Sequence, residues 1–419
     1  MSHESIGRRV LFFAHSCYLD DSNGVTVASR ATMEALSRRG FAVEALSGVI
    51  LESASEVDAD SWLVGRGIRF EVVAGETLTV DARGVRADFP HHFRADVAGV
   101  PIAIHRSPTS RPHDPDPSER AEILSLLGRT LDRFRPHVLL NIGGDLLAHE
   151  ARTLARERGV AVAFALHNFS YNNAATFLTA DAVIAPSRFA ADHYRESLQL
   201  DCVVLPNLVD VARVRASIRD PRYLTFVNPA IVKGFYPFAR IADELGRRRP
   251  DIPILIVESR GDEQTLVGCG IDLRPHGNTF LMSQTSDPRD FWRVTKIALM
   301  PSLWWENQPL VAVEAMINGI PVIGSDRGGI PEALGDAGIV LPLPERLTPF
   351  TRELPAPGEV APWVEAIIRL WDDEEWYADR SLHARDESRR WDPEVIEPLY
   401  VEFFRSLRPG KAPFVTPIY

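Results

Sequence analysis

The sequence has few cysteines and no long apolar run, and each absence argues against a class of protein. Cys17, Cys202 and Cys269 are odd in number and far apart in 419 residues, which favours a reducing compartment over a disulfide framework. None lies near a histidine at the spacing of a zinc site. No run approaches the ~20 apolar residues of a membrane span. The segment VLFFA (10–14) is also too short for the core of a signal peptide. We therefore expect a cytoplasmic protein, with peripheral membrane contact left open.

Positive charge is also in deficit. The chain has 46 Lys and Arg against 57 Asp and Glu, a net charge of −11. That balance argues against a protein that coats nucleic acid or anionic lipid, although a local basic groove remains possible. Hydrophobic residues at 45% and charged residues at 25% are ordinary for a globular protein. A chain of this length exceeds one core, so we expect two domains.

Two series of alternating strands and helices predict an α/β fold with two Rossmann-like domains. The first begins with a strand at 10–14, a loop that puts Gly24 just before a helix, and a strand at 41–47. It resumes over 137–187 after a less regular segment at 50–120. A second series begins at residue 223, and the last ninety residues are expected to be helical. No internal repeat of solenoid length is present.

This pattern sets the predicted domain boundaries. An N-terminal domain is expected over 1–212, a C-terminal domain over 213–384, and a helical tail over 385–419. Segment 213–222 (RVRASIRDPR) is predicted to be the linker between the domains. Ligands of such parallel sheets bind at the carboxyl ends of the strands.

The segment ENQPLVAVE carries two glutamates, Glu306 and Glu314, around an apolar run. Proline is favoured at the first helical position, so a helix should start at about Pro309, with Asn307 or Gln308 near its N-cap. Glu306 then lies in the preceding loop and Glu314 on the helix. The N–H groups of Leu310 and Val311 would point out of the helix start and, with the helix dipole, form an anion site. A nucleotide sugar, with ribose and sugar on either side of a diphosphate, suits this geometry.

With this segment, the chain resembles the retaining glycosyltransferases of family 4, which have the GT-B fold of two Rossmann-like domains facing across a cleft. The resemblance rests on the E-x7-E motif at Glu306 and Glu314 and on EAMINGIPVIGSDRGGIPE (314–332). It implies that Glu314 binds the donor ribose and Glu306 the hydroxyls of the donor sugar. It also implies a C-terminal domain for the donor, an N-terminal domain for the acceptor, and a tail that crosses back to the N-terminal domain.

Lys233 in NPAIVKG is a suitable point charge for the diphosphate. Here the sequence departs from the family, which usually has an arginine where this chain has Asn228. Arg260 and Arg327 are the candidates to replace that charge. A second departure is Pro309, where many members have glycine, because proline lacks one N–H that might bond the donor sugar.

In the predicted N-terminal domain, His167 ends a strand, and the family usually has a histidine there near the transferred sugar. Gly24 resembles the family's glycine loop, although with one glycine instead of two. We assign His167, Lys233 and Glu306 to catalysis, and assign to donor binding Gly24, Asn307, Gln308, Leu310, Val311 and Glu314. The motifs DAD (58–60) and DPD (114–116) are interpreted as loop residues rather than metal ligands.

The resemblance implies a retaining, metal-independent hexosyltransferase that needs no cofactor and transfers a sugar from a nucleotide sugar to a hydroxyl acceptor. UDP is the first choice of nucleotide and GDP the second. Two alternatives remain at this point: a nucleotide-sugar epimerase of the same fold, and a nucleotide-sugar-binding protein that has lost catalysis, to which Asn228 gives some weight. The acceptor and the oligomeric state are not readable from the sequence.

Overall fold

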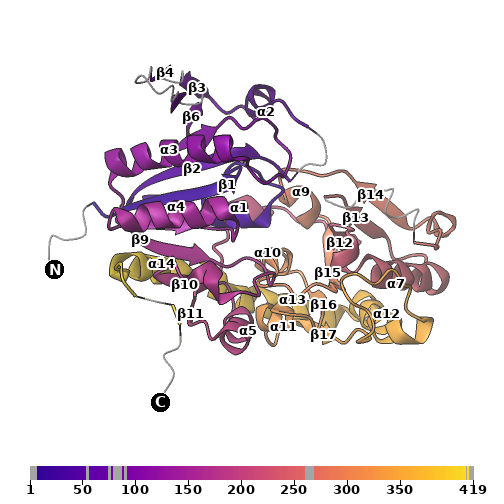
Figure 1. The fold of residues 1–419 in the computed structure, drawn as a ribbon. Helices are drawn as coiled ribbons and strands as arrows, with labels where there is room; N and C mark the ends of the chain where they lie inside the picture. The colour runs from indigo at the N-terminus through magenta and orange to yellow at the C-terminus, as the bar shows by residue number, and fades with distance from the viewer. Residues whose placement is uncertain are drawn as a thin grey trace, which may run out of the picture. The chain divides into compact units, whose positions relative to one another are not determined.

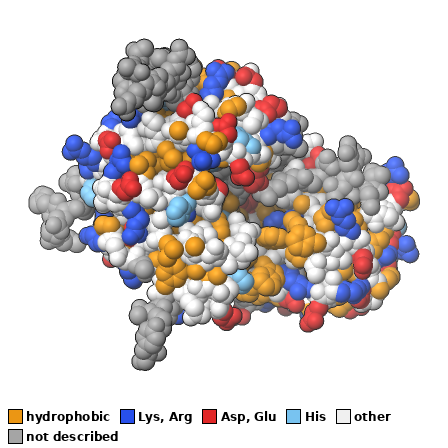
Figure 2. All heavy atoms as spheres, in the orientation of Figure 1, with side chains coloured by type: hydrophobic (Ala, Val, Ile, Leu, Met, Phe, Trp, Pro, Cys, Tyr) orange, Lys and Arg blue, Asp and Glu red, His pale blue; other side chains and the backbone are white. Residues whose placement is uncertain are grey.

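The computed structural model describes residues 7–52, 56–73, 77–78, 87–88, 92–259, 269–411 and 413–414. The chain forms two compact units. The first unit consists of Met1–Pro186, Ala191–Leu208 and Glu397–Tyr419, and the second of Ser187–Ala190 and Val209–Ile396. On the face drawn in Figure 2, acidic and basic side chains are interspersed and do not gather into one basic surface.

The first unit is built on a nine-stranded sheet with the order β11-β10-β9-β8-β1-β2-β7-β6-β3 (Figure 1). The strands from β11 to β7 run parallel, and β6 pairs antiparallel with both β7 and β3. The strands are β1 (Arg9–Ser16), β2 (Ala42–Ile50), β3 (Phe70–Val73), β6 (His92–Val97), β7 (Val100–His105), β8 (Val138–Asn141), β9 (Ala161–Ala165), β10 (Ala182–Ala185) and β11 (Cys202–Val204). A separate antiparallel pair is formed by β4 (Thr77–Leu78) and β5 (Ala87–Asp88).

Helices connect the parallel strands of this sheet. They are α1 (Gly24–Arg38), α2 (Ala59–Gly65), α3 (Pro117–Phe134), α4 (Leu146–Glu157), the 3-10 helix η2 (Ala174–Phe177) and α5 (Arg188–Leu198). The apolar run that predicted the first strand, Val10 to Phe13, is almost entirely buried. Strands covered on both faces need such continuous apolar runs, which is why this one was readable from the sequence.

The second unit has a six-stranded parallel sheet with the order β14-β13-β12-β15-β16-β17. Its strands are β12 (Tyr223–Val227), β13 (Ile254–Val257), β14 (Thr279–Met282), β15 (Thr295–Met300), β16 (Val322–Ser325) and β17 (Ile339–Leu341). Its helices are α6 (Val211–Val214), η3 (Ile231–Lys233), α7 (Phe235–Arg248), η4 (Arg274–His276), α9 (Arg289–Trp292), α10 (Leu310–Ile317), α11 (Ile330–Leu334), α12 (Pro357–Asp372), α13 (Glu374–Ser388) and η5 (Arg389–Trp391). Helix α14 (Pro393–Ser406) begins in the second unit and continues into the first, which resumes at Glu397. The two Rossmann-like units confirm the predicted fold class.

The less regular segment at 50–120 contains the starts of two helices that were not predicted from the sequence. Asp58 caps α2 by accepting a hydrogen bond from the Ser61 N–H, and Asp116 caps α3 by accepting from the N–H groups of Ser118 and Glu119. The motifs DAD and DPD therefore mark the starts of helices, a common role for aspartate. The long helix α3 was not predicted, because its first residues, from Pro117, lie in the less regular segment at 50–120.

The predicted linker is packed in the second unit. Arg219 donates hydrogen bonds to the carbonyls of Thr295 and Asn318, and the Asn318 side chain accepts one from the Ala216 N–H. The change of unit therefore occurs earlier, between Leu208 and Val209. The N–H groups of Asp220 and Arg222 also donate to the carbonyls of Arg293 and Val294, so several backbone groups that a free linker would leave to water are bonded within the second unit.

The C-terminal segment also divides later than residue 385. Helix α13 and the chain up to Ile396 belong to the second unit, and residues from Glu397 onward belong to the first. Within the first unit, the Glu397 carboxylate accepts hydrogen bonds from Arg38 and Arg39, at 2.8 and 2.6 Å. The Tyr400 hydroxyl donates to the Pro206 carbonyl, at 3.1 Å.

Candidate functional site

Three loops of the second unit follow adjacent strands of its sheet, at their carboxyl ends. The 3-10 helix η3 follows β12, residues 301–309 follow β15, and residues 326–329 follow β16. Because β12, β15 and β16 are neighbours in the sheet, their loops meet at one edge. Most of the predicted donor residues lie in these loops.

The backbones of these loops touch, and glycines make the contacts possible. A Cβ on Gly234 would lie 1.7 Å from the Pro301 carbonyl oxygen, and Gly234 has a φ of +84°. A Cβ on Gly328 would lie 2.5 Å from the Glu306 nitrogen, and one on Gly329 would lie 2.3 Å from the Asn307 carbonyl oxygen. Only glycine fits these approaches. The Gly329 N–H also donates to the Glu306 carbonyl, at 2.6 Å.

The structure brings Lys233 and Glu306 together. The Lys233 ammonium donates a hydrogen bond to Glu306 Oε1 at 2.6 Å, and the Ser302 hydroxyl donates to the same oxygen at 3.0 Å. The Glu306 side chain is 11% exposed and the Lys233 side chain 30% exposed. The lysine is thus held by a carboxylate while it stays open to solvent, as a cation that meets a ligand must be. Ser302 was not singled out from the sequence, and its position directly after a buried strand is the signal that would have identified it.

The helix after this loop begins one residue later than predicted. Helix α10 is Leu310–Ile317, and Pro309, in an extended conformation, is its N-cap. Asn307 and Gln308 therefore precede the cap, and neither side chain caps the helix. Proline suits this place because its ring holds φ near −65° and it has no N–H to leave unpaired. Leu310 and Val311 form the first turn, where N–H groups have no partner within the helix.

Glu314 lies in the second turn of α10 and is partly buried. Its Oε2 accepts a hydrogen bond from the indole nitrogen of Trp292, at 3.0 Å. Burial raises the pKa of Glu314 to about 7, and the bond from Trp292 opposes that rise. Burial thus disfavours the charged form of this carboxyl group. Its second oxygen accepts no bond within the described part of the chain, so it can accept hydrogen bonds from a ligand. Trp292, fully buried, was missed in the sequence because it lies in a separate element, the short helix α9.

Asn307 is the most unusual polar group of these loops. It is 9% exposed, and neither its Oδ1 nor its Nδ2 has a hydrogen-bond partner among the described residues. Leaving a buried donor or acceptor unpaired costs about 1–3 kcal/mol. Such groups are rare in native proteins and call for a ligand or an ordered water. Gln308 beside it is also buried, at 7%.

The place of the usual family arginine is taken by an asparagine in a strained conformation. Asn228 has a φ of +63°, which asparagine tolerates better than most residues, and its Oδ1 is buried without a partner in the part of the chain that is described. Arg327 donates to the carbonyls of Leu343 and Pro344, so its guanidinium is already engaged. Arg260 lies outside the described residues.

The structure places Gly24 and His167 in the first unit. Gly24 is the first residue of α1, it is exposed, and a Cβ there would meet nothing within 4 Å. No contact in this unit requires glycine at that position, so the assignment of Gly24 to donor binding stays a prediction.

His167 follows β9 and lines a cavity of about 20 Å³, together with Thr32, Asn207 and Tyr400. Its Nε2 is buried without a partner among the residues described, and a cavity of this size holds roughly one water. Burial lowers the pKa of His167 to about 4, so the ring is neutral at pH 7. A neutral ring can accept or donate a hydrogen bond but is a poor general acid at that pH.

The chain is similar to known glycosyltransferases. Residues 223–373 match the family model described as Glycosyl transferases group 1. The phosphatidyl-myo-inositol mannosyltransferase of Mycolicibacterium smegmatis is 29% identical over 223 residues, which cover 51% of this chain and 54% of that protein. The match thus spans about half the length of that curated relative.

Solved structures extend the likeness over nearly the whole chain. HepE of Anabaena in complex with UDP and glucose superimposes with a TM-score of 0.66 at 15% identity, covering 96% of this chain and 100% of that one. Sucrose-phosphate synthase of Thermosynechococcus elongatus gives 0.65 at 14% identity, covering 95% and 98%. The chain has the GT-B fold and resembles the family 4 glycosyltransferases, as predicted.

One further feature concerns membranes. Within the described ranges, no helix combines the length and the apolar character that crossing a bilayer requires.

Proposed function

We propose that the protein is a retaining glycosyltransferase that moves a sugar from a nucleotide-sugar donor, UDP-linked in preference to GDP-linked, to a hydroxyl acceptor. The observation that carries the proposal is the 2.6 Å contact between Lys233 and Glu306, beside the start of α10. Through this contact, Glu306 of one loop holds Lys233 of another. The ammonium stays partly exposed and lies next to a helix N-terminus. A diphosphate is the ligand whose charge this pair of features matches.

The donor's parts are assigned to residues on either side of that anion site. Glu314 accepts hydrogen bonds from the ribose hydroxyls, and Glu306 accepts from hydroxyls of the donor sugar while it orients Lys233. The unpartnered amide of Asn307 and the N–H groups of Leu310 and Val311 bind the donor between them. Gly24 and His167 lie in the first unit, and their assignments, to donor binding and to a place near the transferred sugar, rest on the family resemblance alone.

The chemistry requires stabilisation of a leaving group rather than a protein nucleophile. As the glycosidic bond breaks, negative charge grows on the departing diphosphate, and Lys233 together with the start of α10 stabilises it. The acceptor hydroxyl attacks from the face that the diphosphate leaves, so the anomeric configuration is retained. Donor binding and departure need no metal in this scheme, because a lysine and a helix terminus supply the positive charge.

The family model and the curated relative are both glycosyltransferases, which favours transfer over epimerisation. Incubation with donor alone, followed by NMR of the sugar, tests the difference, because an epimerase would convert the donor to its epimer. A binding protein without catalysis would show neither hydrolysis nor transfer at any donor concentration.

A nucleotide screen by thermal shift tests the donor assignment. A ligand at 100 times its Kd stabilises the folded state by about 2.7 kcal/mol, so UDP should raise the melting temperature more than GDP or ADP. The same shift should persist in EDTA. A nucleotide response that vanishes in EDTA and returns only with Mg²⁺ or Mn²⁺ would refute metal-independent donor binding.

A further inference from the structure

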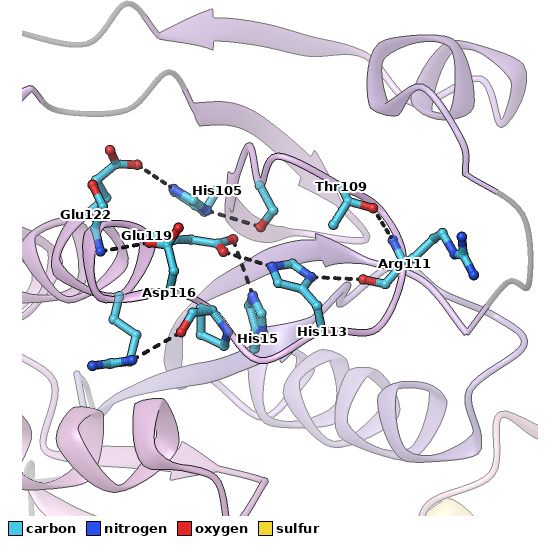
Figure 3. A network of polar contacts seen from close by, with 12 residues as sticks. His15, His105, Thr109, Arg111, His113, Asp116, Glu119 and Glu122 are labelled. Atoms are coloured by element: carbon cyan, nitrogen blue, oxygen red, sulfur yellow. Dashed lines mark hydrogen bonds and ion pairs between the residues drawn. The ribbon is translucent and has the colours of Figure 1, made fainter.

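The first unit contains a cluster of polar side chains that plays no part in the proposed donor site. His15 ends β1, His113 lies in the loop before α3, and Glu119 lies in the first turn of α3. One ligand atom from each lies within 4.8 Å of the others. Figure 3 shows both rings directed toward the Glu119 carboxylate. We propose that His15, His113 and Glu119 bind a divalent transition metal ion, with zinc as the first candidate.

The hydrogen bonds of His113 show that a positive charge belongs beside Glu119. His113 Nδ1 lies 2.9 Å from the Arg111 carbonyl oxygen, which can only accept, so Nδ1 carries a hydrogen. His113 Nε2 lies 2.8 Å from Glu119 Oε2. In a neutral ring Nε2 then presents a lone pair to a carboxylate, and two acceptors face each other. Either a second ring proton or a metal ion resolves this.

The other two atoms of the cluster decide between proton and metal. His15 Nε2 and Glu119 Oε1 are buried and have no hydrogen-bond partner in the described chain, although they lie 3.7 Å apart. Glu119 is only 5% exposed, so water does not readily satisfy that oxygen. A proton on His113 leaves both atoms unsatisfied, and a hydrogen on His15 Nε2 would face Glu119 Oε1 across 3.7 Å, which is beyond hydrogen-bond distance. One metal ion satisfies His15, His113 and Glu119 together.

The backbone around the cluster is specialised to hold it. The pairing of β1 with β2 shifts register between Ala14 and Ser16, at the position of His15. Such irregularities redirect a side chain that would otherwise follow the strand's alternation. A Cβ on Gly48 of the neighbouring strand would lie 2.2 Å from the His15 carbonyl oxygen and 3.0 Å from its ring. Asp116 caps α3 and thereby orients the turn that carries Glu119.

The donor set indicates the class of metal. Two imidazole nitrogens and one carboxylate oxygen suit zinc and its neighbours, whereas Mg²⁺ and Ca²⁺ prefer oxygen ligands alone. Zinc bonds of about 2.0–2.1 Å place tetrahedral ligands roughly 3.3 Å apart. The two histidine nitrogens lie 2.8 and 3.7 Å from the two oxygens of Glu119, and the three ligand atoms lie within 4.8 Å of one another, so the side chains must move closer together to enclose an ion. Three protein ligands leave the fourth position for water or for an oxygen of a ligand.

The test uses the full-length protein without a polyhistidine tag, stripped with a chelator and titrated calorimetrically with Zn²⁺. One ion per chain should bind with a Kd of about 1 µM or tighter, and Zn²⁺ should raise the melting temperature. His113→Ala, His15→Ala and Glu119→Gln should each weaken binding by about 100-fold or more, since loss of even a supporting residue costs 10- to 100-fold. Circular dichroism verifies that each variant folds.

His383→Ala is the matched control. His383 is also a histidine beside a carboxylate, with its Nδ1 3.2 Å from Asp379, but it is exposed on α13. Its loss should leave zinc binding unchanged. Absence of binding at 100 µM Zn²⁺, or equal affinity in wild type and in the folded ligand variants, would overturn the proposal and leave a His113–Glu119 ion pair. Nucleotide binding by the same variants should match wild type, so failure here is distinguishable from failure of the donor site.

Discussion

The loops that follow the parallel strands are stabilised differently in the two units. In the second unit, Gly234, Gly328 and Gly329 allow loop backbones to touch, and Lys233 is already paired with Glu306. In the first unit, a Cβ on Gly24 would meet nothing within 4 Å, so no close approach of backbone requires glycine there. There, buried nitrogens of His15 and His167 and an oxygen of Glu119 lack partners among the described residues. This difference indicates that η3 and the loops 301–309 and 326–329 are stabilised mainly by contacts with one another. The buried polar groups of the first unit, in contrast, need a ligand to satisfy their hydrogen bonds.

Replacing glycine by alanine in each unit should give the largest effect and tests whether the two units differ in this way. Gly234→Ala puts a Cβ against the Pro301 carbonyl at a positive φ, so the free energy of unfolding should fall by about 3 kcal/mol or more. Gly24→Ala should change it by less than about 1 kcal/mol, with a slight gain from reduced chain entropy. Urea denaturation of both variants checks this. Equal stability would mean that the loop contacts are not needed.

Lys233→Ala tests whether the paired lysine acts in catalysis. Because charge grows on the diphosphate as the bond breaks, and no other described cation is assigned to it, kcat should fall by about 30- to 1,000-fold, equivalent to roughly 2–4 kcal/mol. Substrate binding should weaken less. Steady-state kinetics at saturating acceptor measure both quantities. Lys296→Ala is the control, because that lysine lies over the Trp371 ring and has a packing role.

A kcat of Lys233→Ala within about twofold of wild type, with a raised KM, would assign Lys233 to ground-state binding alone. The charge that replaces the family arginine would then have to be sought at Arg260, because the Arg327 guanidinium is engaged by carbonyls.

Glu314→Gln tests whether the Glu314 carboxylate binds the nucleotide or is only a partly buried residue of α10. Hydrogen bonds to charged groups contribute roughly 1.5–3 kcal/mol, so nucleotide affinity should fall by about 10- to 100-fold. Calorimetric titration with the nucleotide measures it, and Glu365→Gln, at an exposed position of α12, is the control. An unchanged Kd would show that Glu314 does not contact the ribose.

The pH dependence of stability has a definite sign at this residue. The pKa of Glu314 is raised to about 7 in the folded state, so the folded protein holds a proton that the unfolded chain releases near its usual pKa of 4.5. Wild type therefore loses stability relative to Glu314→Gln as pH rises from about 4.5 to 7. Above pH 7 the variant should be more stable by on the order of 2 kcal/mol. Chemical denaturation of both proteins at pH 5 and pH 8 measures the difference.

How much of this was readable from the sequence follows from how each site is built. Pro309, Gly328 and Gly329 are backbone constraints, which mark the local sequence, so the donor loops and the pairing of Lys233 with the glutamate segment were within reach. Trp292 approaches Glu314 through tertiary packing, which leaves no local sign, whereas Ser302 could have been identified from its place just after the buried strand β15. The start of α10 was misplaced by one residue, because proline is compatible with both the cap and the first turn.

The His15, His113 and Glu119 cluster lies at the other extreme. Its members come from a strand end, a loop and a helix that was itself not predicted, with no common motif. The sequence predicts no metal site, because no cysteine lies near a histidine at the spacing of a zinc site and DAD and DPD are interpreted as loop residues. A site assembled by a register shift at His15 and a helix cap at Asp116 has no such signature.

Asn307, like Asn228 in the loop after β12, is a buried polar group without a partner among the described residues, so the loops of the second unit also contain unsatisfied groups. Asn307→Leu keeps the approximate volume and removes two buried polar atoms without partners among the described residues, so the unliganded protein should gain about 1–2 kcal/mol. Nucleotide-sugar affinity should fall at the same time. Asn318→Leu is the matched control: Asn318 is equally buried, but it donates to the carbonyls of Val214 and Glu314 and accepts from the Ala216 N–H. Its replacement should destabilise the protein by about 2 kcal/mol or more.

Urea denaturation and nucleotide-sugar titration of both variants decide the matter. If Asn307→Leu is destabilising and binds donor normally, Asn307 supports the loop and its assignment to the donor is wrong. If it is stabilising and binds donor poorly, the second unit, like the first, keeps a costly polar group for its ligand.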